Sequence, residues 1–149
     1  MIMYEKRSAF TMIEIMIVVF IIGLLSTILG PSLMKWVGKG EVSTTTANIG
    51  AIKSSLGEFR MDVGRNPTTA EGLDVLISPP KDKAVQARWH GPYIPGVEAV
   101  PMDAWGRPFI YNNPPVKFKG GKYQKYEIFS YGTGGEEGAK ESDIISAGE

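Results

Sequence analysis

Cysteine is absent from the 149 residues, so no disulfide bond can stabilise the fold and no thiol can act as a nucleophile or bind a metal. His90 is the only histidine, which excludes a histidine-rich metal site. Neither sign of charge predominates, because Lys and Arg number 16, as do Asp and Glu. The formal net charge of zero gives no basic field that would favour nucleic acid as a partner.

Two common enzyme motifs are also missing. The chain has no G-x-S-x-G sequence, and the glycine-rich run at residues 132–135 is not followed by the lysine of a phosphate-binding loop. The lone histidine lies between Trp89 and Gly91, a setting more typical of a loop residue than of a general base. We therefore expect that the protein is not an enzyme.

Charge is missing altogether from residues 15–34. Twenty helical residues, each rising about 1.5 Å, span about 30 Å, the thickness of a bilayer's hydrocarbon core. This predicts a transmembrane helix over residues 10–34, with one carboxylate, Glu14, near its start. An acid costs about 2.5–3.5 kcal/mol at mid-bilayer and less near the interface. Either Glu14 lies at the headgroup level of a plain membrane anchor, or a partner compensates its charge.

The nine residues before this stretch, MIMYEKRSA, carry the basic pair Lys6 and Arg7, which predicts a cytoplasmic N-terminus. A secretory signal peptide would place small residues after its apolar core, whereas Ser8 and Ala9 precede this one. The order of basic leader, small residue, F-T-x-x-E and unbroken apolar helix resembles the class III signal of type IV pilins and type II secretion pseudopilins.

The resemblance implies that a prepilin peptidase cuts between Ala9 and Phe10, removes residues 1–9 and methylates the new amino group of Phe10. Ala9 stands where the family usually has glycine. Glu14 is then the family's acid. We expect it to pair with the Phe10 ammonium group, either within its own chain or in a neighbouring subunit.

Gly30 and Pro31 lie near the outer end of the apolar stretch and predict a helix break. A proline inside a helix removes one hydrogen bond and clashes with the preceding turn. An ordinary kink of a membrane helix explains the pair. Pilins and pseudopilins also have a proline here, and the resemblance implies a segment that extends in the filament.

Residues 35–63 continue the helix outside the membrane. Apolar residues recur there at steps of three and four and form one stripe, which is expected to pack on a soluble domain: Ile49, Ile52, Leu56, Phe59 and Val63. Gly64 is predicted to end the helix.

Residues 64–106 are predicted to form a loop with one short helix. Thr68 or Thr69 can cap a helix that has Glu71 in its first turn. The sequence P-T-T-x-x-G-L-x-x-L at residues 67–76 resembles the major pseudopilin of type II secretion more than the fibre-forming type IV pilins.

A second motif, D-x-W-G-x-P at residues 103–108, resembles the same protein class. A structural role accounts for it: Asp103 is expected to cap its own turn, Trp105 to pack over the sheet edge, and Gly106 to supply an unusual dihedral.

Two strands are predicted at residues 107–111 and 122–130, where apolar and polar residues alternate. The loop between them contains Pro114-Pro115 and Gly120-Gly121, which favours a hairpin. The expected fold is therefore α+β and pilin-like, with a long N-terminal helix packed on a small antiparallel sheet within a globular domain of residues 35–149.

The glycine-rich tail from residue 131 is too rich in glycine for a helix, and a solvated flexible loop accounts for it. The major pseudopilin binds Ca²⁺ in the corresponding segment, so the resemblance implies a calcium site here. Its candidate ligands are the Tyr131 carbonyl and the side chains of Glu136, Glu137, Ser142 and Asp143. Gly134 and Ser142 stand where the family has Asp.

Taken together, these resemblances imply a structural subunit that polymerises into the periplasmic pseudopilus of a type II secretion system and supports export of folded proteins across the outer membrane. The resemblance implies a helical homopolymer and, as partners, minor pseudopilins, the inner-membrane secretion platform and the prepilin peptidase. It also implies a single-pass inner-membrane protein with a cytoplasmic N-terminus and a periplasmic C-terminal domain. A type IV pilin, a minor pseudopilin and a membrane-tethered periplasmic binding module are the alternatives. Fibre pilins usually carry a disulfide loop, which this chain lacks.

Overall fold

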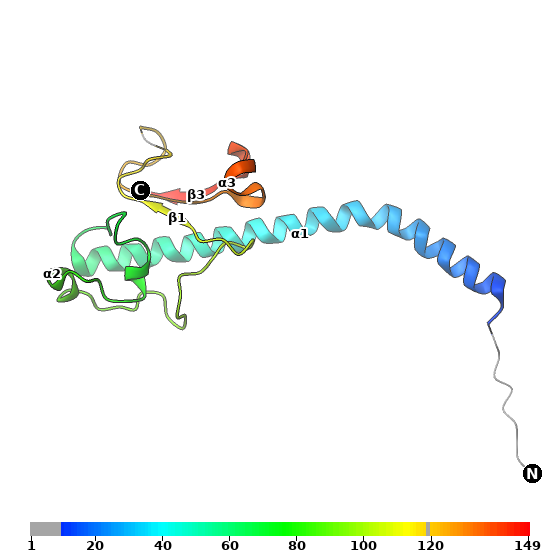
Figure 1. The fold of residues 1–149 in the computed structure, drawn as a ribbon, viewed down its shortest axis with the longest axis horizontal. Helices are drawn as coiled ribbons and strands as arrows, with labels where there is room; N and C mark the ends of the chain where they lie inside the picture. Colours follow the sequence, from blue (N-terminus) through cyan, green and yellow to red (C-terminus); the bar gives the residue numbers. More distant parts are fainter. Residues whose placement is uncertain (1–9, 119) are drawn as a thin grey trace, which may run out of the picture. The chain divides into compact units, whose positions relative to one another are not determined.

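The computed structural model describes residues 10–118 and 120–149, without the side chains of residues 30–35 (Figure 1). The expected leader, including Ala9, lies outside the described residues. The chain divides into two compact units, and the boundary along the chain falls between Lys39 and Gly40.

The first unit is the N-terminal part of α1 (Met12–Val63). Residues Met12–Leu29 have a mean hydropathy of 2.7 and are long and apolar enough to cross a membrane, and none of them is buried in the chain. α1 passes Gly30 and Pro31 as one uninterrupted helix, so the predicted helix break is not present as a gap in the helix. Losing one backbone hydrogen bond of a long helix need not end it, and proline is tolerated in membrane helices.

The second unit begins on the same helix and contains the core. All five residues of the predicted stripe, from Ile49 to Val63, are buried, and Ile52, Leu56 and Phe59 are completely so. Fully burying one such side chain contributes about 1.5–3 kcal/mol. α1 ends as predicted because Gly64 adopts a positive φ of 88°, and its N–H donates to the carbonyl of Arg60 (2.9 Å).

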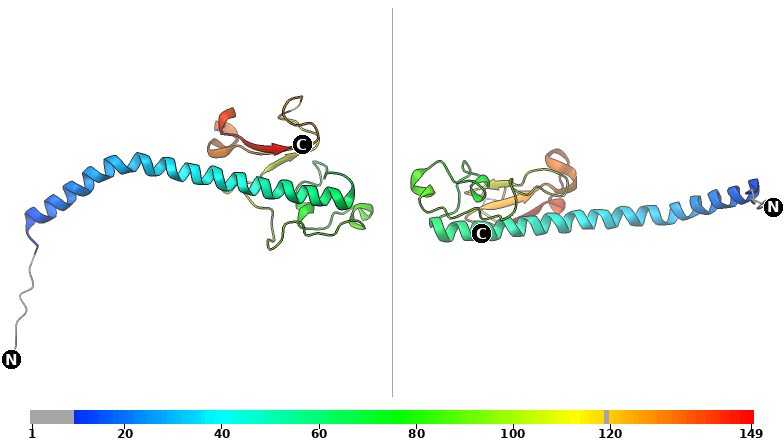
Figure 2. Two further views of the ribbon diagram at one scale, coloured as in Figure 1. Left: turned by 180° about the vertical axis from the view of Figure 1, so that it is seen from behind. Right: turned by 90° about the horizontal axis from the view of Figure 1, so that it is seen from below.

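A three-stranded antiparallel sheet lies beside this part of α1 (Figure 2). Its strands follow the order β1 (Ile110–Asn112), β2 (Glu127–Ser130) and β3 (Ile145–Gly148). Tyr111 is paired with Ile128, and Ile128 with Ala147. The α+β class and the hairpin of β1 and β2 are confirmed, although both strands are shorter than predicted.

β3 is a correction to the sequence analysis, which assigned the whole tail to a loop. Its sequence, Ile-Ser-Ala-Gly, contains one β-branched residue and lacks an alternating pattern, so local propensity gives no strand signal. Pairing with β2 along four residues supplies the hydrogen bonds that propensity does not predict.

Short helical turns fill the connections. The helix expected near Glu71 is only a 3₁₀ turn, η1 (Asp74–Leu76), and α2 (Lys83–Gln86) lies in the predicted loop, capped by Asp82. The glycine-rich tail also contains η2 (Gly132–Gly134), α3 (Gly135–Gly138) and η3 (Glu141–Asp143), so the expectation of no helix there is wrong. Each glycine in a helix costs about 1 kcal/mol relative to alanine, and a single helical turn contains too few residues for this cost to become large.

Candidate functional site

The first candidate site is the N-terminal end of α1, where Thr11 and Glu14 form a capping box. The Glu14 N–H donates to Thr11 Oγ1 (3.3 Å), and the Thr11 N–H donates to Glu14 Oε2 (3.5 Å). Two backbone donors that a helix start leaves unpaired are thereby satisfied. The sequence analysis did not assign this role to Glu14, although the spacing T-x-x-E is its known signal.

Phe10 precedes this cap in non-helical chain, and its side chain is 77% exposed. The apolar side chains that follow it on α1 are exposed on all sides, including Met12, Phe20 and Leu29. Such a surface is stable only against lipid or other apolar helices. The structure thus presents an uncovered apolar segment with one acid at its start.

The second candidate site is the D-x-W-G turn, for which the sequence predicts a structural role. The Asp103 side chain is 1% exposed, and its Oδ1 accepts from the amides of Trp105 (3.0 Å) and Arg107 (2.8 Å). Its Oδ2 accepts from the hydroxyl of Ser130 on β2 (2.6 Å). Gly106 has a φ of 77°, so both the predicted cap and the predicted unusual dihedral are confirmed.

This turn is fixed to α1 by three polar side chains that lie about one helical turn apart. The Trp105 indole N–H donates to Glu41 Oε2 (3.0 Å), Thr45 Oγ1 accepts from an amide of the turn (3.0 Å), and Asn48 donates to a carbonyl beside it (2.9 Å). Trp105 was expected to pack over the sheet edge. Its indole N–H contacts α1, because a half-buried indole N–H needs an acceptor, and packing of the ring over the sheet edge stays a prediction.

A third polar site was missed entirely: Glu127 on β2 is completely buried. Its carboxylate accepts from the side chain of Asn112 (2.7 Å) and from three consecutive amides, those of Val116, Lys117 and Phe118 (2.8–3.0 Å). Burial favours a raised pKa, but these donors together hold the pKa of Glu127 below its usual value. The buried charge therefore orders the loop after β1.

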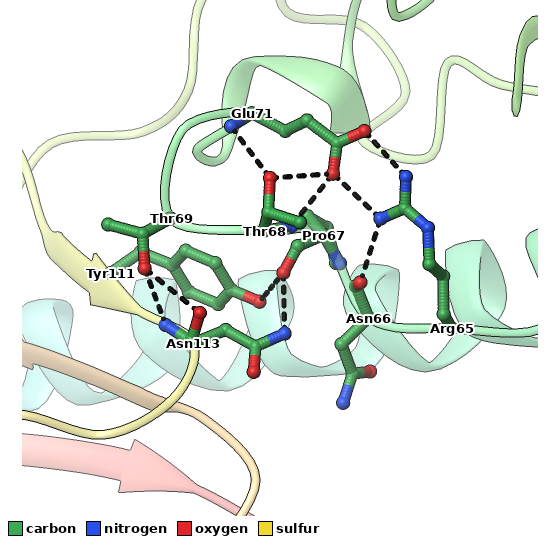
Figure 3. Close-up of polar contacts among 8 residues, drawn as sticks. All are labelled: Arg65, Asn66, Pro67, Thr68, Thr69, Glu71, Tyr111 and Asn113. Carbon is green, nitrogen blue, oxygen red and sulfur yellow. Dashed lines mark hydrogen bonds and ion pairs between the residues drawn. The ribbon is translucent and has the colours of Figure 1, made fainter. Parts of the chain in front are cut away.

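The P-T-T motif forms the fourth polar site (Figure 3). Arg65 donates to both carboxylate oxygens of Glu71, each at 2.7 Å, and the Thr68 amide and hydroxyl donate to Glu71 Oε2 (2.7 and 3.0 Å). The hydrogen bonds from Arg65 lower the pKa of Glu71 to about 2. Thr68 therefore caps the turn that contains Glu71, whereas the N-cap position of η1 is Leu73, so the predicted helix cap is wrong.

The same motif is tied to β1. The Tyr111 hydroxyl and the Asn113 side-chain amide both donate to the carbonyl of Pro67, each at 2.7 Å (Figure 3). The Asn113 backbone N–H donates to the Thr69 hydroxyl (2.9 Å), and this hydroxyl donates to the Asn113 backbone carbonyl (3.1 Å). The motif therefore connects the end of α1 to the sheet.

The candidate calcium ligands in the tail do not converge. The side chains of Glu136, Glu137, Ser142 and Asp143 are on exposed residues, and the Ser142 hydroxyl donates to Asp143 Oδ1 (3.0 Å). Within residues 10–118 and 120–149, no group of three or more acidic or histidine residues is placed to hold a metal. Ca²⁺ requires six to eight oxygens. The tail as placed does not fit the ion, and calcium binding stays a prediction.

The first part of α1 is an uncovered apolar segment with one acid, Glu14, in the capping box at its start. A small α+β unit follows on the same helix. This combination defines the pilin-like class of structural subunits. Residues 32–147 match the family described as "Type II secretion system (T2SS), protein G", and residues 5–30 match the prokaryotic N-terminal methylation motif. The chain belongs to this type II secretion system protein G family and is a structural pseudopilin, not an enzyme.

Individual relatives agree with this assignment. The chain is 33% identical over 135 residues to type II secretion system core protein G of Aeromonas hydrophila, covering 90% of this chain and 88% of that protein. It is 31% identical over 144 residues to core protein G of Escherichia coli K12, covering 97% and 93%. The crystal structure of the major pseudopilin of enterohaemorrhagic Escherichia coli is similar, with a TM-score of 0.56, 28% identity and coverage of 78% of this chain and 93% of that one.

Proposed function

We propose that this pseudopilin polymerises through the apolar segment of α1 (Met12–Leu29) and that Glu14 sets the register between subunits. The observation that carries the proposal is the position of Glu14. It is the one acid at the start of a segment whose apolar side chains are exposed on every side. Neighbouring copies of the same segment can cover these side chains in a filament.

The charge of Glu14 has a candidate partner in the Phe10 ammonium group that cleavage after Ala9 creates. Two opposite charges about 4 Å apart attract by about 4 kcal/mol at an effective dielectric of 20, before desolvation is counted. A subunit out of register leaves both charges unpaired in lipid. Only Oε2 takes part in the capping box, at 3.5 Å, so the carboxylate retains capacity for a second partner.

The location and partners follow from this role. The chain is held in the inner membrane by its apolar segment, with its N-terminus in the cytoplasm and residues 40–149 in the periplasm. It is processed by the prepilin peptidase, assembles with minor pseudopilins on the inner-membrane platform, and supports export of folded proteins across the outer membrane. Gly30 and Pro31 weaken the helix at the outer end of the segment, so unwinding in the filament would start there.

Two substitutions separate the charge of Glu14 from its capping role. Glutamine can still complete a capping box, but it carries no charge. Both Glu14→Ala and Glu14→Gln should therefore keep normal membrane levels and an intact mass that begins at Phe10, while filaments and secretion are lost. Thr27→Ala serves as the control, because the Thr27 hydroxyl only bonds the carbonyl of Leu24 in its own helix (2.7 Å). Normal filaments from Glu14→Gln would show that capping, and not charge, is what assembly requires.

A further inference from the structure

The C-terminal loop, residues 131–144, already has a cation in contact with it. The guanidinium of Arg107 donates through Nη2 to the carbonyl of Gly132. The same side chain lies beside the buried carboxylate of Asp103, with Nε 3.5 Å from Oδ2, and its Cζ lies 5.7 Å from the centre of the Trp105 ring. Arg107 thus links the D-x-W-G turn to the loop.

Glycines in the loop make room for this side chain. A Cβ added to Gly135 would lie 2.5 Å from Arg107 Nη1, so any larger residue there would displace the guanidinium. Gly132 and Gly135 both have positive φ values, 67° and 64°, which other residues rarely adopt. The backbone of the loop is therefore shaped around the guanidinium.

A third glycine of the loop is packed as closely. A Cβ added to Gly134 would lie 2.9 Å from the backbone nitrogen of Ala139, so a side chain there would force the loop to shift. Gly132 also packs directly on the backbone of Asp143, so the two ends of the loop are in direct contact.

We propose that the Arg107 guanidinium is the resident cation that closes the C-terminal loop, and that this loop consequently needs no Ca²⁺. An arginine guanidinium is a cation that donates its hydrogen bonds in a fixed planar geometry. It can offset part of the negative charge of the tail, which includes Glu136, Glu137, Glu141 and Asp143. Its hydrogen bond to a backbone carbonyl is of the stronger, charge-assisted kind.

Hydrogen–deuterium exchange of the full-length chain in detergent micelles tests this directly. Amide exchange in residues 131–144 of the wild type should be the same in EGTA and in millimolar CaCl₂. Arg107→Gln should accelerate exchange in this segment by about tenfold or more, because a charge-assisted bond is lost, while residues 49–63 stay protected. Arg107→Lys keeps the positive charge but loses the planar set of guanidinium donors, so amide exchange in residues 131–144 should be faster than in the wild type and slower than in Arg107→Gln.

Arg88→Gln is the matched control, since Arg88 is exposed on a loop outside this site. It should leave exchange in residues 131–144 unchanged. Slower exchange of the wild-type loop in CaCl₂ than in EGTA would overturn the proposal and favour a metal. An unchanged rate in Arg107→Gln would also overturn it. Exchange is measured within the folded chain, so both results are independent of filament assembly.

Discussion

The apolar segment and the globular unit of this pseudopilin satisfy their side chains in opposite ways. In the segment, the hydroxyls of Ser26 and Thr27 donate to carbonyls of their own helix (2.8 and 2.7 Å), while the apolar side chains are uncovered. In residues 40–149, most large apolar side chains are buried in a core, although a few such as Met61 are exposed, and several polar side chains connect distant parts of the chain, as Asp103 does with Ser130. The apolar side chains of the segment have no packing partners within the described chain, so their contacts must come from outside it.

Two phenylalanines on the same helix should respond very differently to truncation. Phe59 is completely buried, whereas Phe20 is 72% exposed. Phe59→Ala should lower the free energy of unfolding of the globular unit by about 3–5 kcal/mol, because it leaves a cavity in the core. Phe20→Ala should leave that free energy unchanged. Chemical denaturation in micelles, followed by tryptophan fluorescence, measures both, and equal losses would contradict the division into two regions.

The buried carboxylate of Glu127 provides the next largest effect. Glu127→Gln replaces one acceptor oxygen with an amide donor that faces the N–H groups of the loop after β1. Each unsatisfied buried donor costs about 1–3 kcal/mol, and we expect a loss in that range. The exposed Glu98→Gln is the control and should be within about 0.5 kcal/mol of the wild type. If Glu127→Gln left the free energy of unfolding unchanged, the loop would not depend on this carboxylate.

The Arg65–Glu71 pair gives a smaller, pH-dependent effect. The Arg65 side chain is 39% exposed, so solvent screening limits the pair's contribution to about 1 kcal/mol or less. The pKa of Glu71 falls from an ordinary value of 4.5 to about 2 in the fold, so its contribution is complete above pH 4.5 and is lost as pH falls towards 2.

Denaturation of wild type and Glu71→Gln at several pH values checks this contribution. The difference between them should be largest near neutral pH and should shrink between pH 4.5 and 2. A difference that stays constant over this range would show that the carboxylate charge is not what stabilises the loop.

Sequence patterns predicted the parts of the fold that are set locally. The helical spacing of the apolar residues from Ile49 to Val63 predicted which face of α1 is buried. The residue types of Asp103 and Gly106 predicted the turn that they form. These features depend on neighbours a few residues away. They are therefore visible in a single sequence.

Features that depend on distant partners could not be predicted in this way. β3 exists because β2 pairs with it, and Glu127 is buried because three amides of another loop surround it. Arg107 was placed in a strand, but its guanidinium contacts Gly132 in the tail. No local pattern specifies such contacts, since each is decided by how the chain packs in three dimensions.

The most direct test of the central claim is chemical cross-linking of assembled pseudopili with a membrane-permeable carbodiimide. This reagent joins a carboxylate to an amine that it contacts, and we expect an amide between Glu14 and the Phe10 amino group of another subunit. The product should appear as covalent dimers and larger ladders, with the Phe10–Glu14 link identified by mass spectrometry and absent from Glu14→Gln. A Phe10–Glu14 link found only in the monomer band would contradict the claim that Glu14 sets the register between subunits.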